Sequence, residues 1–305
     1  MAQKNTTLHP RPFPGLRLDP TNTLPAMNRL SRATRFWVLT SLGTLVLLVY
    51  LFSTAPMPLQ VDQTSRNTLS TQEALSLLAY ENDITRTLFT KTIVGEGKKN
   101  GLRFDEKWAE DDVVAGPLPA LFLRGVALDL SQSDVPLGLY LGSDFPIEKS
   151  NGFTGESATQ FAAMREDSQP KHFIHSVTGD HVSMFPDFAS AAPCVSCHNA
   201  HEQSAKNDWQ LGDIMGATTW SYPSDSITTD EFMDMLMAYR QGVETVWAAY
   251  GAELEQLPED QRPERGDRWP SEGNYIPDHS ALRDSLDNIG GRHILEELIS
   301  LTVTR

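Results

Sequence analysis

Cysteine is scarce in this chain of 305 residues, and basic residues are outnumbered by acidic ones. Two cysteines are too few for a scaffold held by several disulfides or for a zinc site with four cysteine ligands. Lys and Arg total 25 against 40 Asp and Glu, a formal net charge of −15. Nucleic-acid binding depends on a basic surface, so this composition argues against it. The sequence has no internal repeat and no low-complexity tract, and with 40% hydrophobic residues it is typical of a folded chain.

The sequence also lacks the signatures of common enzyme classes. It holds no H-E-x-x-H zinc-protease motif, no Gly-rich phosphate-binding loop and no recognisable Ser-His-Asp arrangement. Hydrolysis and group transfer therefore receive no support. We expect a carrier, a sensor or a structural protein rather than an enzyme.

One hydrophobic run has the length that a membrane requires. Residues 36–52 are strongly apolar, carry no charge and have aromatic side chains near both ends, as a bilayer-spanning helix does. The alternatives are a buried core helix and a cleaved signal peptide, for which Ser53 and Ala55 would form a small-residue cleavage site. We predict an uncleaved transmembrane anchor over 36–55.

Charge differs between the two sides of this run. Residues 1–35 hold six basic residues and one acidic residue, so the rest of the chain is five units more negative than the total of −15. The positive-inside rule then places residues 1–35, interpreted as a disordered tail, in the cytoplasm and the chain after about residue 56 outside it. In a bacterium this predicts a single-pass protein of the inner membrane with its main domain in the periplasm.

The region that follows shows alternating helical and strand patterns. A capping box, Ser70-x-x-Glu73, opens a predicted helix that we expect to end at the glycines of 95–97. Apolar patterns then predict further elements: a helix from 117, a strand at 137–141, a helix over 155–166, a hairpin around 173–185 and a strand at 214–222.

The last part of the chain, 228–305, has a helical pattern. A second capping box, Thr228-x-x-Glu231, precedes about six turns with one apolar face. The Pro-rich segment 257–277 predicts a surface loop, and a final helix is expected over 280–302. Long exposed apolar stripes are rare on monomers, so we expect this helical extension to pack on the preceding domain or to form a homo-oligomer.

Both cysteines belong to one motif, C-x-x-C-H at 194–198, which is the attachment sequence of c-type haem. Two thiols three positions apart can form thioethers with the two vinyl groups of one porphyrin, and His198 then reaches the iron as proximal ligand. A disulfide-exchange site does not require the histidine, and a zinc site needs further soft ligands; both remain as alternatives. We predict one covalent haem c at Cys194 and Cys197.

Residues beyond the motif extend this interpretation. The sequence C-V-S-C-H-N at 194–199 is followed by K-N-D-W-Q-L-G-D-I-M-G at 206–216. Together they resemble a family of c-type haem domains with a PAS-like fold, catalogued as a domain of unknown function, whose members share CxxCHN and a K-x-x-W-x-x-G-D-x-x-G segment. The stretches 117–127 and 141–146 are similar to the family's upstream segments.

The resemblance covers about residues 70–223. It implies an α+β, PAS-like haem domain over 65–223, with helices packed on an antiparallel sheet. Family members occur alone or in front of signalling output domains. The helical extension, 228–305, falls outside the resemblance, and no kinase, cyclase or similar output sequence follows the domain here.

The sequence leaves the sixth ligand of the iron open. Both cysteines serve the attachment, and His201 is three residues after His198, on the same side of a helix, so it is a poor ligand for the opposite porphyrin face. Trp209 is expected to pack on the porphyrin edge or in the core. An open or water-filled position is the alternative to five candidate ligands: His172, His175, His181, Met184 and Met215.

Three classes of function fit these features. One covalent haem and a membrane anchor favour a tethered one-electron carrier with a redox protein as partner. The PAS-like resemblance favours a redox or gas sensor that signals through a separate protein, and the apolar-faced helices of 228–305 favour an accessory subunit of a membrane complex. A six-coordinate iron suits electron transfer and an open site admits small gases, so the sixth ligand separates the first two classes.

Overall fold

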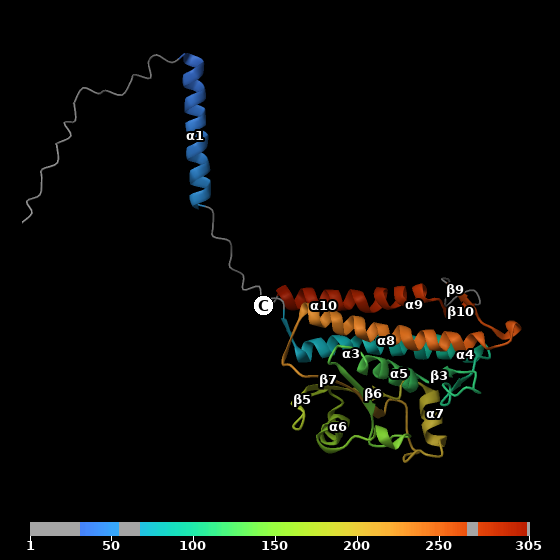
Figure 1. Ribbon diagram of the computed structural model, residues 1–305. Helices are drawn as coiled ribbons and strands as arrows, with labels where there is room; N and C mark the ends of the chain where they lie inside the picture. Colours follow the sequence, from blue (N-terminus) through green and yellow to red (C-terminus); the bar gives the residue numbers. More distant parts are fainter. Residues whose placement is uncertain (1–30, 55–67, 267–273, 304–305) are drawn as a thin grey trace, which may run out of the picture. The chain divides into compact units, whose positions relative to one another are not determined.

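The computed structural model describes residues 31–54, 68–266 and 274–303, which belong to two compact units, Met1–Val61 and Asp62–Arg305. The described part of the first unit is one helix, α1 (Arg32–Thr54), which buries none of its residues and is long and apolar enough to cross a membrane (Figure 1). A signal sequence near an N-terminus shares these properties. The helix begins inside the segment predicted as a tail, and residues 1–30 of that tail lie outside the described residues.

The two threonines in the middle of α1 find their hydrogen-bond partners within the helix. Thr40 Oγ1 donates to the Phe36 carbonyl and Thr44 Oγ1 to the Thr40 carbonyl, both at 2.9 Å. A hydroxyl bonded to the preceding turn needs no water, so these threonines suit an apolar surrounding. The predicted apolar span is confirmed as a helix of membrane-crossing length.

The second unit is a mixed α+β fold built around a four-stranded sheet. The strand order is β4-β7-β6-β5, and every neighbouring pair is antiparallel. The strands are β4 (Gly138–Gly142), β5 (Lys171–Ile174), β6 (His181–Phe188) and β7 (Ile214–Tyr222). The predicted hairpin and both predicted strands are confirmed, as is the α+β class.

Helices cover one face of this sheet and form the main core (Figure 1). These are α3 (Thr71–Leu88), the π-helical turn η2 (Phe89–Val94), α4 (Gly95–Lys99), α5 (Pro119–Ser131) and α8 (Thr229–Glu255). Phe232, Tyr239 and Trp247 of α8 share one buried cluster with Leu75 of α3 and Trp220 of β7. The prediction that the helical extension packs on the preceding domain is therefore confirmed for the apolar face of α8.

The opposite face of the sheet is covered by α6 (Gly155–Asp167) (Figure 1). Phe161 and Met164 of this helix are buried against Met184 of β6 and Ala217 of β7 in a second, smaller core. Neighbouring residues of a strand point to opposite faces, which is why Met184 belongs to the small core and Phe185 to the main one.

The helix that begins at the first capping box does not end at the glycines of 95–97. It continues through η2 and α4 to Lys99, and the chain turns at Gly101, whose φ of 88° suits glycine. Gly97 has another role: a Cβ there would lie 3.0 Å from the Phe104 ring. The glycine permits close packing inside the helix, and the predicted boundary was wrong for that reason.

The segment 257–277, predicted as a loop, holds short elements in its described parts. These are the 3-10 turn η4 (Glu259–Gln261) and two strands that pair in parallel, β9 (Glu264–Gly266) and β10 (Asn274–Pro277); residues 267–273 lie outside the described residues. The predicted final helix is present in three parts: α9 (His279–Leu286), the π-helical turn η5 (Asp287–Gly291) and α10 (Arg292–Val303). The remaining short elements are β1 (Thr68–Ser70), paired with β8 (Ser226–Thr228), β2 (Phe104–Asp105), paired with β3 (Gly116–Pro117), and the 3-10 turn η3 (Lys149–Asn151).

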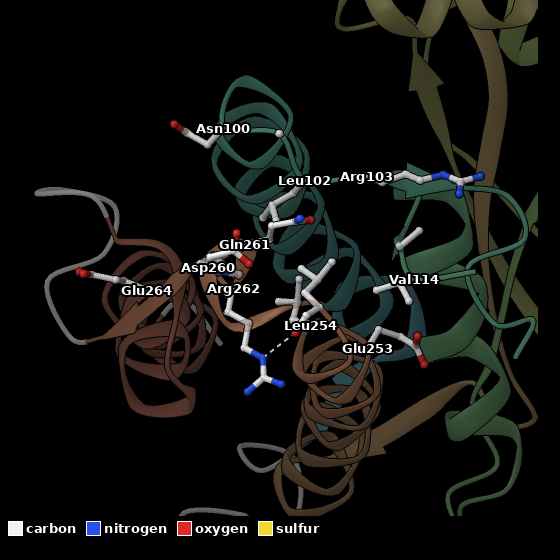
Figure 2. A pocket seen from close by; sticks show the side chains of 14 residues that line it. Asn100, Leu102, Arg103, Val114, Glu253, Leu254, Asp260, Gln261, Arg262 and Glu264 are labelled. Carbon is white, nitrogen blue, oxygen red and sulfur yellow. Dashed lines mark hydrogen bonds between the residues drawn. The ribbon is translucent and has the colours of Figure 1, made fainter. Parts of the chain in front are cut away.

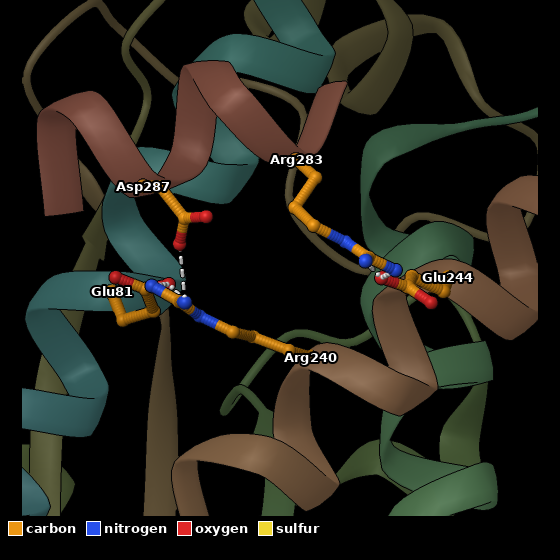
Figure 3. Close-up of polar contacts among 5 residues, drawn as sticks. All are labelled: Glu81, Arg240, Glu244, Arg283 and Asp287. Carbon is orange, nitrogen blue, oxygen red and sulfur yellow. Dashed lines mark hydrogen bonds and ion pairs between the residues drawn. The ribbon is translucent and has the colours of Figure 1, made fainter. Parts of the chain in front are cut away.

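An ion-pair cluster joins α3, α8 and η5 (Figure 3). The carboxylate of Glu81 is buried and accepts a hydrogen bond from Arg240 Nε at 2.8 Å, while Arg240 Nη1 donates to Asp287 at 2.6 Å. One turn further along α8, Arg283 Nε of α9 donates to Glu244 at 3.0 Å. These contacts hold the last helices against the two long ones.

Candidate haem-attachment site

The C-x-x-C-H motif lies on a short helix, α7 (Ala192–Ala200), that follows the end of β6. Pro193 stands in its first turn, where backbone N–H groups have no helical partner and proline is well tolerated. Residues three and four apart share a helix face. Cys194, Cys197 and His198 therefore lie on one face of α7, as attachment to a single flat porphyrin requires.

Both thiols are free in the structure. Cys194 is half-buried and Cys197 is exposed, and they form no disulfide. Desolvation, together with the nearby carboxylate of Glu106, raises the pKa of the Cys197 thiol. A disulfide-exchange site uses a thiol whose pKa is lowered, so this environment favours the attachment interpretation over that alternative.

The His198 imidazole is held in a form suited to ligand binding. Burial, followed by the nearby His201 ring, lowers the pKa of His198, and the neutral imidazole is the form that binds a metal. Its Nδ1 atom is buried and has no hydrogen-bond partner among the described residues. Buried polar atoms are usually paired, so an unpaired one beside two free thiols fits a site that a further group completes.

Asn199 ties α7 to the loop that follows it. Its Oδ1 accepts a hydrogen bond from the Trp209 backbone N–H at 2.8 Å, and its Nδ2 donates to the Trp209 carbonyl at 3.0 Å. Lys206 lies over the indole ring, with its Nζ 4.6 Å from the ring centre. Asn199, which ends the motif, and Lys206 and Trp209, which belong to the segment after it, are thus in contact through Trp209.

Two ion pairs near α7 could not be anticipated from the sequence. Arg86 of α3 donates two hydrogen bonds to Asp187 of β6, at 2.9 and 3.0 Å, across 101 positions of sequence. His201 Nε2 lies 3.1 Å from a carboxylate oxygen of Glu106, in the loop after β2. Both contacts depend on how strands and helices meet, and no local spacing signals them.

His201 is placed differently from the sequence-based expectation. It is the C-cap residue of α7 and has extended backbone angles, φ −69° and ψ 131°. The helical spacing from His198 does not apply beyond the last turn, so the argument from a shared helix face was wrong. The half-buried imidazole of His201 instead contacts the Glu106 carboxylate.

The three histidines proposed as sixth ligands lie on the β5–β6 hairpin, away from α7. His172 Nδ1 is 2.8 Å from Ser183 Oγ, and His175 Nδ1 accepts from the Thr178 backbone N–H at 3.3 Å in the turn. His181 begins β6 and is six residues before Asp187, which corresponds to ~20 Å of strand at ~3.3 Å per residue.

The two methionine candidates differ in position. Met184 is fully buried in the small core with Phe161 and Met164, so its thioether serves packing. Met215 lies between Ile214 and Gly216, at the end of the sheet that β6 leaves to enter α7. Of the five candidates, Met215 is the one that strand register brings toward the motif.

Metal ions held by side chains alone need several ligands close together. In the described ranges no group of three or more His, Cys, Asp or Glu side chains converges in this way. A haem iron takes four nitrogen ligands from the porphyrin, so the protein supplies one or two. The arrangement on α7 meets that smaller requirement.

Figure 2 shows a separate cavity of about 780 Å³. It is lined by residues 100–103 after α4, by Val114 and Ala115, by the end of α8 and by residues of 257–264. Arg262 Nε donates to the Leu257 carbonyl at 2.8 Å. None of its lining residues belongs to α7, so it forms no part of the candidate site.

Comparison with protein-family models, curated proteins and solved structures finds no match for this chain. The resemblance to PAS-like haem domains therefore stays a prediction. The candidate site is interpreted from its own residues.

Proposed function

We propose that this chain is a membrane-anchored protein that carries one covalent haem c and transfers single electrons on the outer side of the cytoplasmic membrane. The observation that carries the proposal is the shared face of α7, which presents two free thiols and an imidazole with an unpaired, buried Nδ1 atom. The antiparallel sheet with helices on both faces supports a PAS-like domain as the scaffold.

The chain's own residues would hold the group as follows. The Cys194 and Cys197 thiols each add across one vinyl double bond; the sulfur bonds to one carbon and the thiol proton goes to the other, so no oxidant or leaving group is needed. His198 offers a neutral imidazole to the iron. When bound, the haem supplies reversible one-electron chemistry.

The negative charge of the domain supports a role in binding a basic partner protein. The part of the chain after α1 carries all of the net negative charge. A strongly acidic surface steers a basic partner protein toward it, and salt weakens the attraction. One attachment motif limits the covalent haem to one electron at a time, which suits a carrier.

A haem-based gas sensor is the second candidate. The observation in its favour is that four of the five candidate sixth ligands lie at the far end of the hairpin or inside the small core. An open sixth position would follow if Met215 does not ligate. The third class, an accessory subunit, was based on the apolar-faced helices of 228–305. The domain's own core buries the apolar face of α8, while Leu295 and Ile299 of α10 are exposed.

Mass spectrometry of the exported protein tests the attachment. We expect one haem that survives denaturation and acid extraction, and a Cys194→Ala, Cys197→Ala double variant that carries none covalently. Loss of the haem from the wild-type protein in acidified solvent would contradict the proposal.

Carbon monoxide binding to the reduced protein separates the two candidates. A carrier with Met215 as sixth ligand binds CO slowly, and Met215→Ala then binds it at least tenfold faster. Fast binding by the wild-type protein, unchanged in Met215→Ala, would favour the sensor. Met184→Leu serves as the control, because Met184 lies in the small core.

A further inference from the structure

Trp209 carries a second buried polar atom without a partner close to α7. The residue is 4% exposed, and its indole Nε1 has no hydrogen-bond partner in the part of the chain that the structure describes. A buried N–H left unpaired destabilises the folded state, because the group has lost its water and gained no acceptor. The fold therefore gains from any acceptor that reaches this atom.

The indole is held firmly in this position. Asn199 bonds both the N–H and the carbonyl of the Trp209 backbone. The ring of Phe145 meets the indole edge-on with centroids 6.1 Å apart, and Lys206 Nζ lies over the indole ring. An N–H fixed from several sides is preorganised for a ligand rather than free to turn toward solvent.

The chemistry of these groups selects the ligand. The indole N–H is a donor with no acceptor capacity, so its ligand must bring a hydrogen-bond acceptor. The Lys206 ammonium over the ring is already paired with Asp208. A carboxylate oxygen is a strong acceptor for such an N–H. Haem carries two carboxylates on the edge of its porphyrin. Asn199 directly follows His198, so its two hydrogen bonds to the Trp209 backbone connect Trp209 to the proposed iron ligand.

We propose that the Trp209 indole N–H donates a hydrogen bond to a haem carboxylate, with Asn199 as the positioning residue that holds Trp209 beside α7. This inference rests on the proposed function, because it needs the covalent haem. It goes further by assigning the group that orients the porphyrin edge.

Trp209→Phe tests the proposal, since phenylalanine keeps an aromatic ring and removes the N–H. Resonance Raman spectra should show the carboxylate bending mode at lower frequency in the variant, with covalent haem content unchanged. Trp220→Phe is the matched control: Trp220 is also buried with an unpaired Nε1, but it packs against Tyr239 in the main core. The carboxylate bending mode of Trp220→Phe should have the same frequency as in the wild type. An equal shift in both variants would overturn the proposal.

Two further measurements keep the test decisive if Trp209→Phe does not fold. Asn199→Ala should shift the bending mode in the same direction. Asn199→Asp keeps the acceptor for the Trp209 backbone N–H, so its bending mode should lie closer to that of the wild type. In the wild-type protein, exchange of N–H for N–D should shift the same mode. A wild type with covalent haem and no isotope shift overturns this inference alone, whereas a wild type without covalent haem overturns the proposed function.

Discussion

Glu81 shows how one residue can depend on the whole fold. Its carboxylate is fully buried between α3, α8 and η5, with Arg240 and Asp287 as charged neighbours. Burial is the largest influence and raises its pKa, Arg240 opposes this, and Asp287 adds to it. Taking these charges out of water is costly, so the presence of the buried pair is not by itself evidence of added stability.

The raised pKa predicts a particular dependence of stability on pH. The folded state holds the Glu81 proton more tightly than the unfolded state, so its contribution is fully present below pH 4.5 and is lost as pH rises through the folded pKa. We expect the unfolding free energy of wild type relative to Glu81→Gln to fall over that range. Urea denaturation of both proteins at several pH values measures it, and a difference that grows with pH would contradict the assignment.

The glycines of η5 offer a paired test of the same cluster. A Cβ at Gly290 would overlap Glu81 Oε2, whereas a Cβ at Gly291 would meet its nearest neighbour at 3.9 Å. Gly290→Ala should therefore lower the unfolding free energy by about 1–3 kcal/mol. Gly291→Ala is the control and should change it much less; equal effects in denaturant titrations would show that helix propensity, not the contact, is measured.

Helix ends are the elements whose structure follows most directly from local residues. In both capping boxes the first residue accepts from the backbone of the third helical residue, and Glu73 or Glu231 bonds back. These contacts need only four adjacent positions. That is why the starts of α3 and α8 were predicted correctly while the end of the first helix was not.

Ser70→Ala should remove about 1 kcal/mol from the unfolding free energy, because the Glu73 backbone N–H in the first turn of α3 loses its acceptor. Ser76→Ala is the control on the same helix: its hydroxyl bonds the Gln72 carbonyl on the exposed face, and its loss should leave stability almost unchanged. Thermal denaturation of both variants measures the difference. Equal destabilisation would contradict a stabilising role of the Ser70 cap.

Other parts of the fold were beyond the reach of local patterns. The sheet order places β7 between β4 and β6, and the pairs Arg86–Asp187 and Glu81–Arg240 join positions 101 and 159 residues apart. The placement of Cys194, Cys197 and His198 on one face of α7 could be predicted, because it follows from their spacing of three and four positions on a helix. The surroundings of that site depend on tertiary contacts, which a single sequence does not encode at any fixed spacing.

At the scale of the whole molecule, the uneven charge sets the predicted orientation. Six basic residues precede or begin α1, and the chain after it is acidic. An alkaline-phosphatase fusion at the C-terminus should be active in bacteria, because that enzyme folds outside the cytoplasm. Replacing Arg29, Arg32 and Arg35 by Gln should reduce its activity several-fold, and an inactive wild-type fusion would contradict the topology.

The pairing of β1 with β8 has a mechanical consequence. Thr68 lies opposite Thr228, and directly after this ladder the Thr71 backbone N–H donates to the Asp225 carbonyl at 3.0 Å. Strand β1 is thus hydrogen-bonded to β8 at the point where both α3 and α8 begin. Separation of this ladder would therefore free the first turns of α3 and α8 at the same time, so we expect the starts of these two helices to open as one unit.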